Sequence, residues 1–213
     1  MSAILAGIAT EEDAEAGGLV KGVAIGIVTQ NQDDSGMGRV KLRFPWRENE
    51  SETHWARIAV AMAGSDRGTY FLPEVGDEVL VAFERGDVRH PYVLGALWNG
   101  EDSPPATNDD GNNDVRVIKS RKGHELIFND GSTPHIELHT HDGKKVFLDE
   151  HKIEVDDGGG NSVVIDADGG SITLKRTTSV SVSSPQIDLD ASGTMSVKAG
   201  GTLTIQGALV QIN

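Results

Sequence analysis

The second half of the chain repeats a short motif in which one residue separates two apolar residues. Successive motifs lie roughly 7 to 10 residues apart, a regular spacing that is typical of stacked repeats. Residues two apart share one face of a strand, so each motif predicts a very short strand with one apolar face. A single ribbon of such strands cannot cover that face by itself, and the sequence therefore predicts partners. The motifs are Leu126/Phe128, Ile136/Leu138, Val146/Leu148, Ile153/Val155, Val163/Ile165, Ile172/Leu174, Val180/Val182, Ile187/Leu189, Met195/Val197, Leu203/Ile205 and Val210/Ile212.

Composition limits the function classes that the chain can serve. The 213 residues include 26 glycines and few aromatics, which favours turn-rich β structure over a helical bundle. The formal net charge of −14 argues against binding to nucleic acid and against adsorption to an anionic membrane. Without cysteine, the chain has neither disulfides nor thiolate metal sites. Residues 1–9 lack the basic start of a secretory signal, so we expect synthesis and assembly in a cytoplasm.

Four zones are visible along the chain. Residues 1–21 are expected to form an N-terminal arm, and residues 22–98 a compact β domain. Residues 99–114 hold almost no apolar side chains and predict a linker. The repeat occupies residues 115–213. Within the β domain, glycine-rich turns separate five strand runs, which favours a small closed barrel of the OB type. The runs are Val23–Thr29, Arg39–Pro45, Trp55–Met62, Glu78–Glu84 and Tyr92–Trp98.

The repeat predicts a needle made by three chains. An interval of about 8 residues leaves room for only one short strand and one corner, whereas a coil of a single-chain β-helix needs about 20 residues or more. If three chains each give one wall, all apolar pairs point to a common axis. The fold class is then all-β, with an N-terminal OB-fold barrel followed by an intertwined three-chain β-helix needle. The expected needle core includes Leu174, Val180, Val182, Ile187, Leu189, Met195, Val197, Leu203 and Ile205.

An ordinary antiparallel meander is the alternative for this region. Asp-Gly pairs at 130–131, 142–143, 157–158 and 168–169 support it, because Asp-Gly is a hairpin signal. Eleven consecutive rungs with no longer strand among them favour the needle instead.

Several motifs of the β domain resemble a known family. They are the runs at residues 38–46 (GRVKLRFPW), 54–58 (HWARI), 71–83 (FLPEVGDEVLVAF) and 86–99 (GDVRHPYVLGALWN), together with Gly68. They are similar to the OB domain of contractile-tail central spikes, namely phage baseplate assembly protein V and VgrG-type proteins. The resemblance implies a homotrimeric spike with OB domains at the top of a β-helical needle, part of a phage tail or tail-like injection particle that pierces a target envelope.

The chain departs from that family in ways that suggest partners. About 20 residues precede the β domain, so the hub expected at the OB end is a separate protein. Residues 99–114 leave no room for the lysozyme domain of some spikes. The C-terminal segment lacks the His-x-His of a metal-bound apex, so we expect a PAAR-type tip protein to cover Leu209, Val210 and Ile212.

No catalytic, cofactor or metal site is expected. His139 and His141 form a His-x-His, but Ile136 and Leu138 set the inward face, so both histidines are expected to point outward. Asp188 and Asp190 alternate with apolar residues and are expected on a solvated wall. Two other functions remain as alternatives, a glycan-binding tail fibre tip and an OB-fold oligonucleotide-binding protein. Scarce aromatics and the acidic balance disfavour both.

Overall fold

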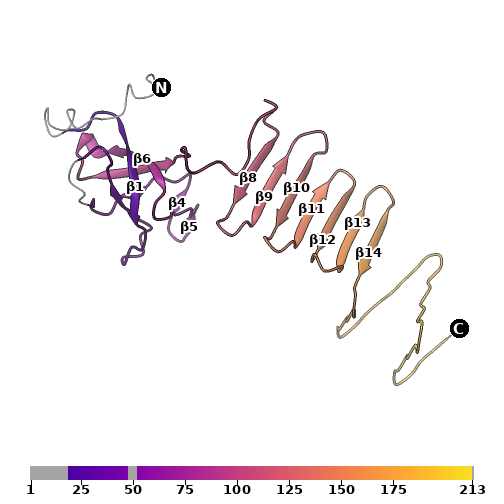
Figure 1. The fold of residues 1–213 in the computed structure, drawn as a ribbon. Coiled ribbons are helices and arrows are strands. Elements are labelled where there is room, and N and C mark those ends of the chain that lie inside the picture. The colour runs from indigo at the N-terminus through magenta and orange to yellow at the C-terminus, as the bar shows by residue number, and fades with distance from the viewer. Residues whose placement is uncertain (1–18, 48–51, 213) are drawn as a thin grey trace. The chain divides into compact units, whose positions relative to one another are not determined.

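The computed structural model describes residues 19–47 and 52–212, and the expected arm at residues 1–21 lies mostly outside this part. The chain divides into two compact units after Asn113 (Figure 1). The predicted all-β class is confirmed: apart from a 3-10 turn at Glu84–Gly86 (η1), every regular element between described residues is a strand. No helix in the described ranges is long or apolar enough to cross a bilayer.

The first unit is a small sheet that closes on itself. Its strand order is β2-β1-β6-β7-β3, antiparallel except for the parallel pair β3–β7. The two outer strands meet through an antiparallel bridge between Val40 and Ala56, whose backbone hydrogen bonds measure 2.7 and 3.1 Å. Closure of five short strands in this way is what an OB barrel requires. The strands are β1 Val23–Gln30, β2 Lys41–Arg43, β3 Arg57–Ile58, β6 Glu78–Phe83 and β7 Pro91–Ala96.

Strand alternation builds the core of this unit. Along β6, Val79, Val81 and Phe83 point inward, and the residues between them are only half-buried. Phe44 joins them, with its ring 5.4 Å from that of Phe83. All eleven buried apolar side chains among the described residues lie between Val20 and Val93. The hydrophobic core of the chain is therefore the core of its first unit.

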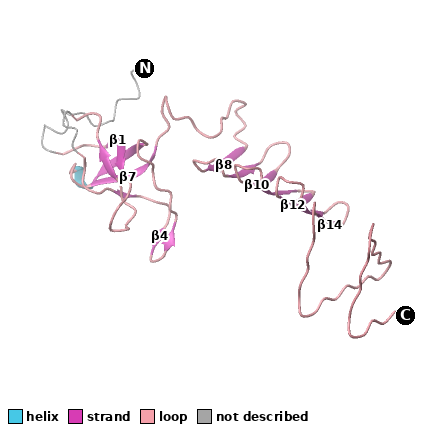
Figure 2. Cartoon of the chain, turned by 60° about the horizontal axis from the view of Figure 1, so that its bottom comes forward, coloured by secondary structure: helices cyan, strands magenta, loops and turns pink. Residues whose placement is uncertain are grey.

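One part of the first unit differs from the sequence expectation. The predicted run Trp55–Met62 forms a strand only over Arg57–Ile58. The residues that follow form a separate small hairpin, β4 Ala63–Gly64 and β5 Arg67–Gly68 (Figure 2). The apolar side chains of this segment, such as Val60 and Met62, are exposed, so alternation there does not correspond to a buried strand face.

The second unit is a sheet of seven strands in sequence order, each antiparallel to the next (Figure 1). Residues 115–175 thus have the connectivity of the antiparallel meander, the alternative that the Asp-Gly pairs supported. Gly143 and Gly158 adopt positive φ in two of the connecting turns, as hairpin turns require. The strands are β8 Val115–Lys119, β9 Glu125–Asn129, β10 His135–His139, β11 Lys145–Asp149, β12 Lys152–Asp156, β13 Ser162–Asp166 and β14 Ser171–Lys175.

After β14 the chain continues to residue 212 without a strand, although the apolar motif repeats without interruption. None of the backbone–backbone hydrogen bonds among the described residues involves residues 178–209. A backbone that finds no backbone partner among the described residues either remains in water or pairs with another chain.

Candidate functional site: an uncovered apolar face

The pairing register sorts the side chains of the second unit onto two faces. Leu138 lies opposite Leu126 on one side and Val146 on the other, while Ile136 lies opposite Phe128 and Leu148. The same alignment continues through the remaining strands and gives two apolar columns along one face. Arg116 is the one charged residue that the register places in these columns on β8–β14. The columns consist of Ile118, Leu126, Leu138, Val146, Val155, Val163 and Leu174, and of Phe128, Ile136, Leu148, Ile153, Ile165 and Ile172.

The opposite face, which we call the polar face, is mostly charged or polar but also carries Val117, Ile127 and Val164, and its side chains contact one another. Phe147 lies near its middle, with the ammonium groups of Lys145 and Lys152 at 5.8 and 5.4 Å from its ring centroid. Lys152 also donates a hydrogen bond of 2.8 Å to Glu154. This hydrogen bond lowers the pKa of Glu154 and raises that of Lys152. Long side chains that lie across the sheet in this way cover one another.

Burial is the reverse of what a soluble sheet normally shows. The side chain of Glu154 on the polar face is 14% exposed, whereas the flanking Ile153 and Val155 on the apolar face are 43% and 47% exposed. An exposed apolar surface that is contiguous over several strands marks an interaction site. Nothing in the chain's own described residues covers this face.

A groove runs along one of the two apolar columns. It has a volume of about 470 Å³, and its floor is formed by Leu138, Val146, Val155, Val163 and Leu174. Charged residues from the adjacent turns and strand ends line it, among them Lys144, Asp157 and Arg176. The groove is thus apolar at its base and charged at its rim.

The expected needle-core and tip residues are all exposed in the single chain. Leu174 ends the apolar face of the sheet, and the others follow β14. Leu209 and Ile212 are the most exposed of them, at 83% and 86%. The structure therefore brings none of them together within one chain, and their proposed contacts would have to come from other chains.

The histidines are distributed over the polar face and the turns. His139 lies on the same face as Glu137, and its Nδ1 is hydrogen-bonded to the Glu137 carboxylate at 2.5 Å. Leu138 points to the other face, so His139 points away from the apolar columns, as expected. His141 lies in the following turn, where its ring meets that of His124 edge-on at 5.0 Å. Within the described ranges, no three His, Asp or Glu side chains converge as metal ligands would.

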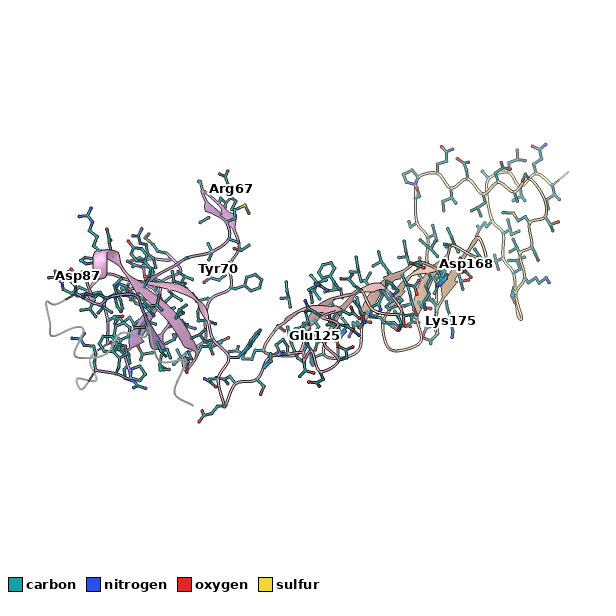
Figure 3. The ribbon with its side chains drawn as sticks, turned by 90° about the horizontal axis from the view of Figure 1, so that it is seen from above. Arg67, Tyr70, Asp87, Glu125, Asp168 and Lys175 are labelled. Carbon is teal, nitrogen blue, oxygen red and sulfur yellow. The ribbon has the colours of Figure 1, made fainter. Side chains whose placement is uncertain are left out.

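Sequence reasoning did not identify an apolar surface on the first unit. Met37, Tyr70 and Phe71 are 66%, 75% and 67% exposed, around a hollow of about 590 Å³ beside the β4–β5 hairpin. Figure 3 shows Arg67 and Tyr70 on this hairpin and the segment that follows it. The available signal was the pair of short apolar runs at residues 60–62 and 70–72, but the first of them falls within the predicted strand run Trp55–Met62.

The first unit is similar to a domain of known proteins. Residues 24–98 match the family described as the type VI secretion system/phage-baseplate injector OB domain. The chain is 32% identical over 127 residues to the type VI secretion system spike protein VgrG3 of Vibrio cholerae, a match that covers 55% of this chain and 12% of that protein. It is 37% identical over 89 residues to the spike protein VgrG2a of Pseudomonas aeruginosa, which covers 40% of this chain and 10% of that protein.

A third relative carries a different name. The actin cross-linking toxin VgrG1 of Vibrio cholerae is 38% identical over 74 residues, which is 33% of this chain and 7% of that protein. The chain thus spans about a tenth of the length of these curated relatives.

Proposed function

We propose that this chain, which carries an OB domain of the type VI secretion and phage-baseplate injector family and resembles VgrG-type spikes, is the central spike of a contractile injection machine. Three copies associate through residues 115–213 into one needle. Contraction of the machine drives this needle through the target envelope. The observation that carries the proposal is the burial pattern of the second unit, where most side chains of the apolar face are exposed while Glu154 on the polar face is only 14% exposed.

Three copies are the smallest number that closes this face around an axis. Two sheets packed face to face would bury their apolar sides too, so the choice of three copies rests on the similarity to VgrG-type spikes. Three walls that meet edge to edge form a closed prism with all apolar columns inside. The columns contain Val, Ile, Leu and one Phe, and their burial contributes about 1.5–3 kcal/mol for each side chain.

The segment after β14 supports a closer association in the lower part of the needle. Its motif continues, its apolar side chains are exposed, and residues 178–209 make no backbone–backbone hydrogen bond with the described chain. Strands that pair between chains would supply the missing backbone hydrogen bonds and would cover the exposed apolar side chains. We infer that each wall of the upper part is the sheet β8–β14 of one chain, whereas the three chains intertwine from about Arg176 onward.

The two ends of the spike are expected to bind other proteins. At the OB end, the exposed surface with Met37, Tyr70 and Phe71 suits docking to a separate hub protein. At the C-terminal end, Leu209, Val210 and Ile212 suit a PAAR-type tip protein that covers the open strand edges. Tyr70→Ser with Phe71→Ser should therefore leave the trimer intact but prevent incorporation of the spike into particles.

The proposed role is mechanical and requires no cofactor or catalytic residue. The toxin name of one relative belongs to that protein, of which this chain covers 7%. The spike would be assembled in the cytoplasm as part of a phage tail, a tail-like particle or a related secretion machine. It would touch the target membrane only during penetration.

The mass of the purified full chain tests the proposal directly. Mass photometry or light scattering should give about three times the chain mass of 22.6 kDa. A stable, monodisperse monomer would overturn the proposal. Binding to single-stranded oligonucleotides at low salt, or to glycans, would instead favour one of the two alternatives.

A further inference from the structure

The two edges of the seven-stranded sheet carry opposite charge. The register places the ends of the strands in two rows, and the turns that join them alternate between the two edges. We call one the groove edge (residues 119–125, 139–145, 156–162 and 175–176), because it borders the groove. The other is the acidic edge (residues 114–115, 129–135, 149–152 and 166–171).

The charges of the two edges differ in sign. The groove edge carries seven Lys or Arg against four Asp or Glu, and the acidic edge carries six Asp or Glu against one Lys. In Figure 3, Glu125 and Lys175 lie along one side of the sheet and Asp168 along the other. The chain as a whole is strongly acidic, so a positive edge does not follow from its composition.

We propose that the acidic edge of each copy docks into the groove edge of the next copy, so that complementary charge fixes how the three walls of the needle assemble. This inference rests on the proposed trimer and adds the surfaces that meet. The occupant of the groove is a second copy of this chain. Its Phe128, Ile136, Leu148 and Ile153 column lies beside the acidic edge and would enter the groove together with it.

Symmetry supports this arrangement. Around a threefold axis, each interface joins two different surfaces of identical copies, because the contact runs head to tail. Around a twofold axis parallel to the needle, the acidic edge of one copy would also lie against the groove edge of the other, because residue i then contacts residue j and j contacts i. The opposite charges therefore require neighbouring copies to run parallel to one another, and the number of three copies comes from the proposed trimer.

The groove itself offers room and partners for the neighbouring edge. Lys144, Lys175 and Arg176 line the groove beside its apolar floor. Glu150 and Asp168 are exposed on the opposite edge, where Asp168 contacts His151 at 2.7 Å. Asp130, which pairs with Arg116 at 2.9 Å, adds a third carboxylate to that edge. Partial burial of these charges at an interface would strengthen their attraction relative to an exposed ion pair.

Charge reversal at both edges tests the inference with the full chain. The groove variant carries Lys144→Glu, Lys175→Glu and Arg176→Glu, and the swap variant adds Asp130→Lys, Glu150→Lys and Asp168→Lys. The control carries Lys21→Glu, Arg67→Glu and Arg85→Glu, which change net charge equally but lie in the first unit. The concentration at which half of the trimer dissociates is measured by analytical ultracentrifugation at two salt concentrations.

The groove variant should dissociate at least about tenfold more readily than the wild type, and the effect should shrink at high salt. The swap variant should recover most of the loss, and the control should resemble the wild type. Equal losses in the groove and control variants, or no loss in either, would overturn the docking of unlike edges. So would a groove variant that the swap fails to rescue, including one that does not fold. A wild-type chain that is not trimeric would instead contradict the proposed function.

Discussion

Leu138 and Val146 lie directly opposite each other on β10 and β11, and both point to the face that the chain leaves uncovered. Their neighbours Glu137 and Phe147 also form an opposing pair, but on the polar face, where both are half-buried. Adjacent residues of this one hairpin therefore point to opposite faces of the sheet, one apolar and one polar. Leu138 is 54% exposed although it lies in an apolar column, which shows why a single copy is an incomplete structure.

A lysine on either face of β13 should distinguish the single chain from the assembly. Ile165 points to the apolar face and is 41% exposed, while the adjacent Val164 on the polar face is only half-buried in the single chain. In a trimer, Ile165→Lys would place a charge at the closed interior, at a cost of several kcal/mol, and should abolish trimerisation. Val164→Lys should leave the trimer intact. Light scattering on both variants provides the measurement.

A larger loss of trimer in Val164→Lys than in Ile165→Lys would contradict a covered apolar face. If the chain acted alone, Ile165→Lys would lie in water and cost little, whereas Val164→Lys would disturb the packed polar face. Circular dichroism at the same concentrations separates loss of association from loss of folding.

The segment after β14 should be protected from hydrogen exchange in the assembled protein. Residues 178–209 find no backbone–backbone partners among the described residues of their own chain, so their amides would exchange within seconds in an isolated chain. Pairing between chains should slow exchange there to the level of β10–β13. Deletion from Val180 onward should also weaken the trimer. Fast exchange throughout this segment in a purified trimer would contradict the intertwined lower needle.

Asp33 should stabilise the first unit in a pH-dependent way. Its carboxylate accepts two hydrogen bonds from Arg39, at 2.7 and 2.8 Å, and others from the backbone amides of Ser35 and Met37. The hydrogen bonds from the Arg39 guanidinium are the main reason that the pKa of Asp33 lies well below its ordinary value of 3.8. Asp33→Asn should lower the melting temperature at neutral pH.

The sign of the pH dependence follows from the depressed pKa. Asp33 contributes its full stabilisation above the ordinary value of 3.8 and loses it as pH falls toward the lower folded-state value. The difference between wild type and Asp33→Asn should therefore persist at pH 5 and narrow below pH 3.8. Fluorescence reports on this unit alone, because Trp46, Trp55 and Trp98 all lie in it. Asp34→Asn, at an exposed neighbouring position, serves as the matched control.

The sequence was most informative where a regular pattern had one physical meaning. The predicted run Glu78–Glu84 matches β6 almost to the residue, and the alternate side chains Val79, Val81 and Phe83 of that strand pack on a core. At residues 55–62 the same kind of alternation was misleading, since Val60 and Met62 are exposed rather than buried.

In the repeat, the apolar motif predicted the strands and their common face but not which chain supplies the neighbouring strand. Both a needle wall and a meander place Leu138 beside Val146. The difference lies in the turns, where Gly143 and Gly158 at positive φ let β10–β13 fold back on themselves. The opposite charges of the two edges were also missed, because they emerge only when alternate turns are placed side by side.

Gly86 should be a sensitive position of the OB domain. It has a φ of +84°, and its carbonyl accepts a 2.7 Å hydrogen bond from the Val20 amide. A side chain added there would approach the Val20 carbonyl oxygen to 3.0 Å, and a positive φ costs an L-residue about 1–2 kcal/mol. Gly86→Ala should therefore lower the free energy of unfolding of the first unit by about that amount, measured by urea titration with tryptophan fluorescence. Gly95→Ala, where no atom lies within 4 Å of the added carbon, should be nearly neutral. Equal effects of the two substitutions would show that backbone strain at Gly86 contributes nothing, and that the contact with Val20 adapts freely.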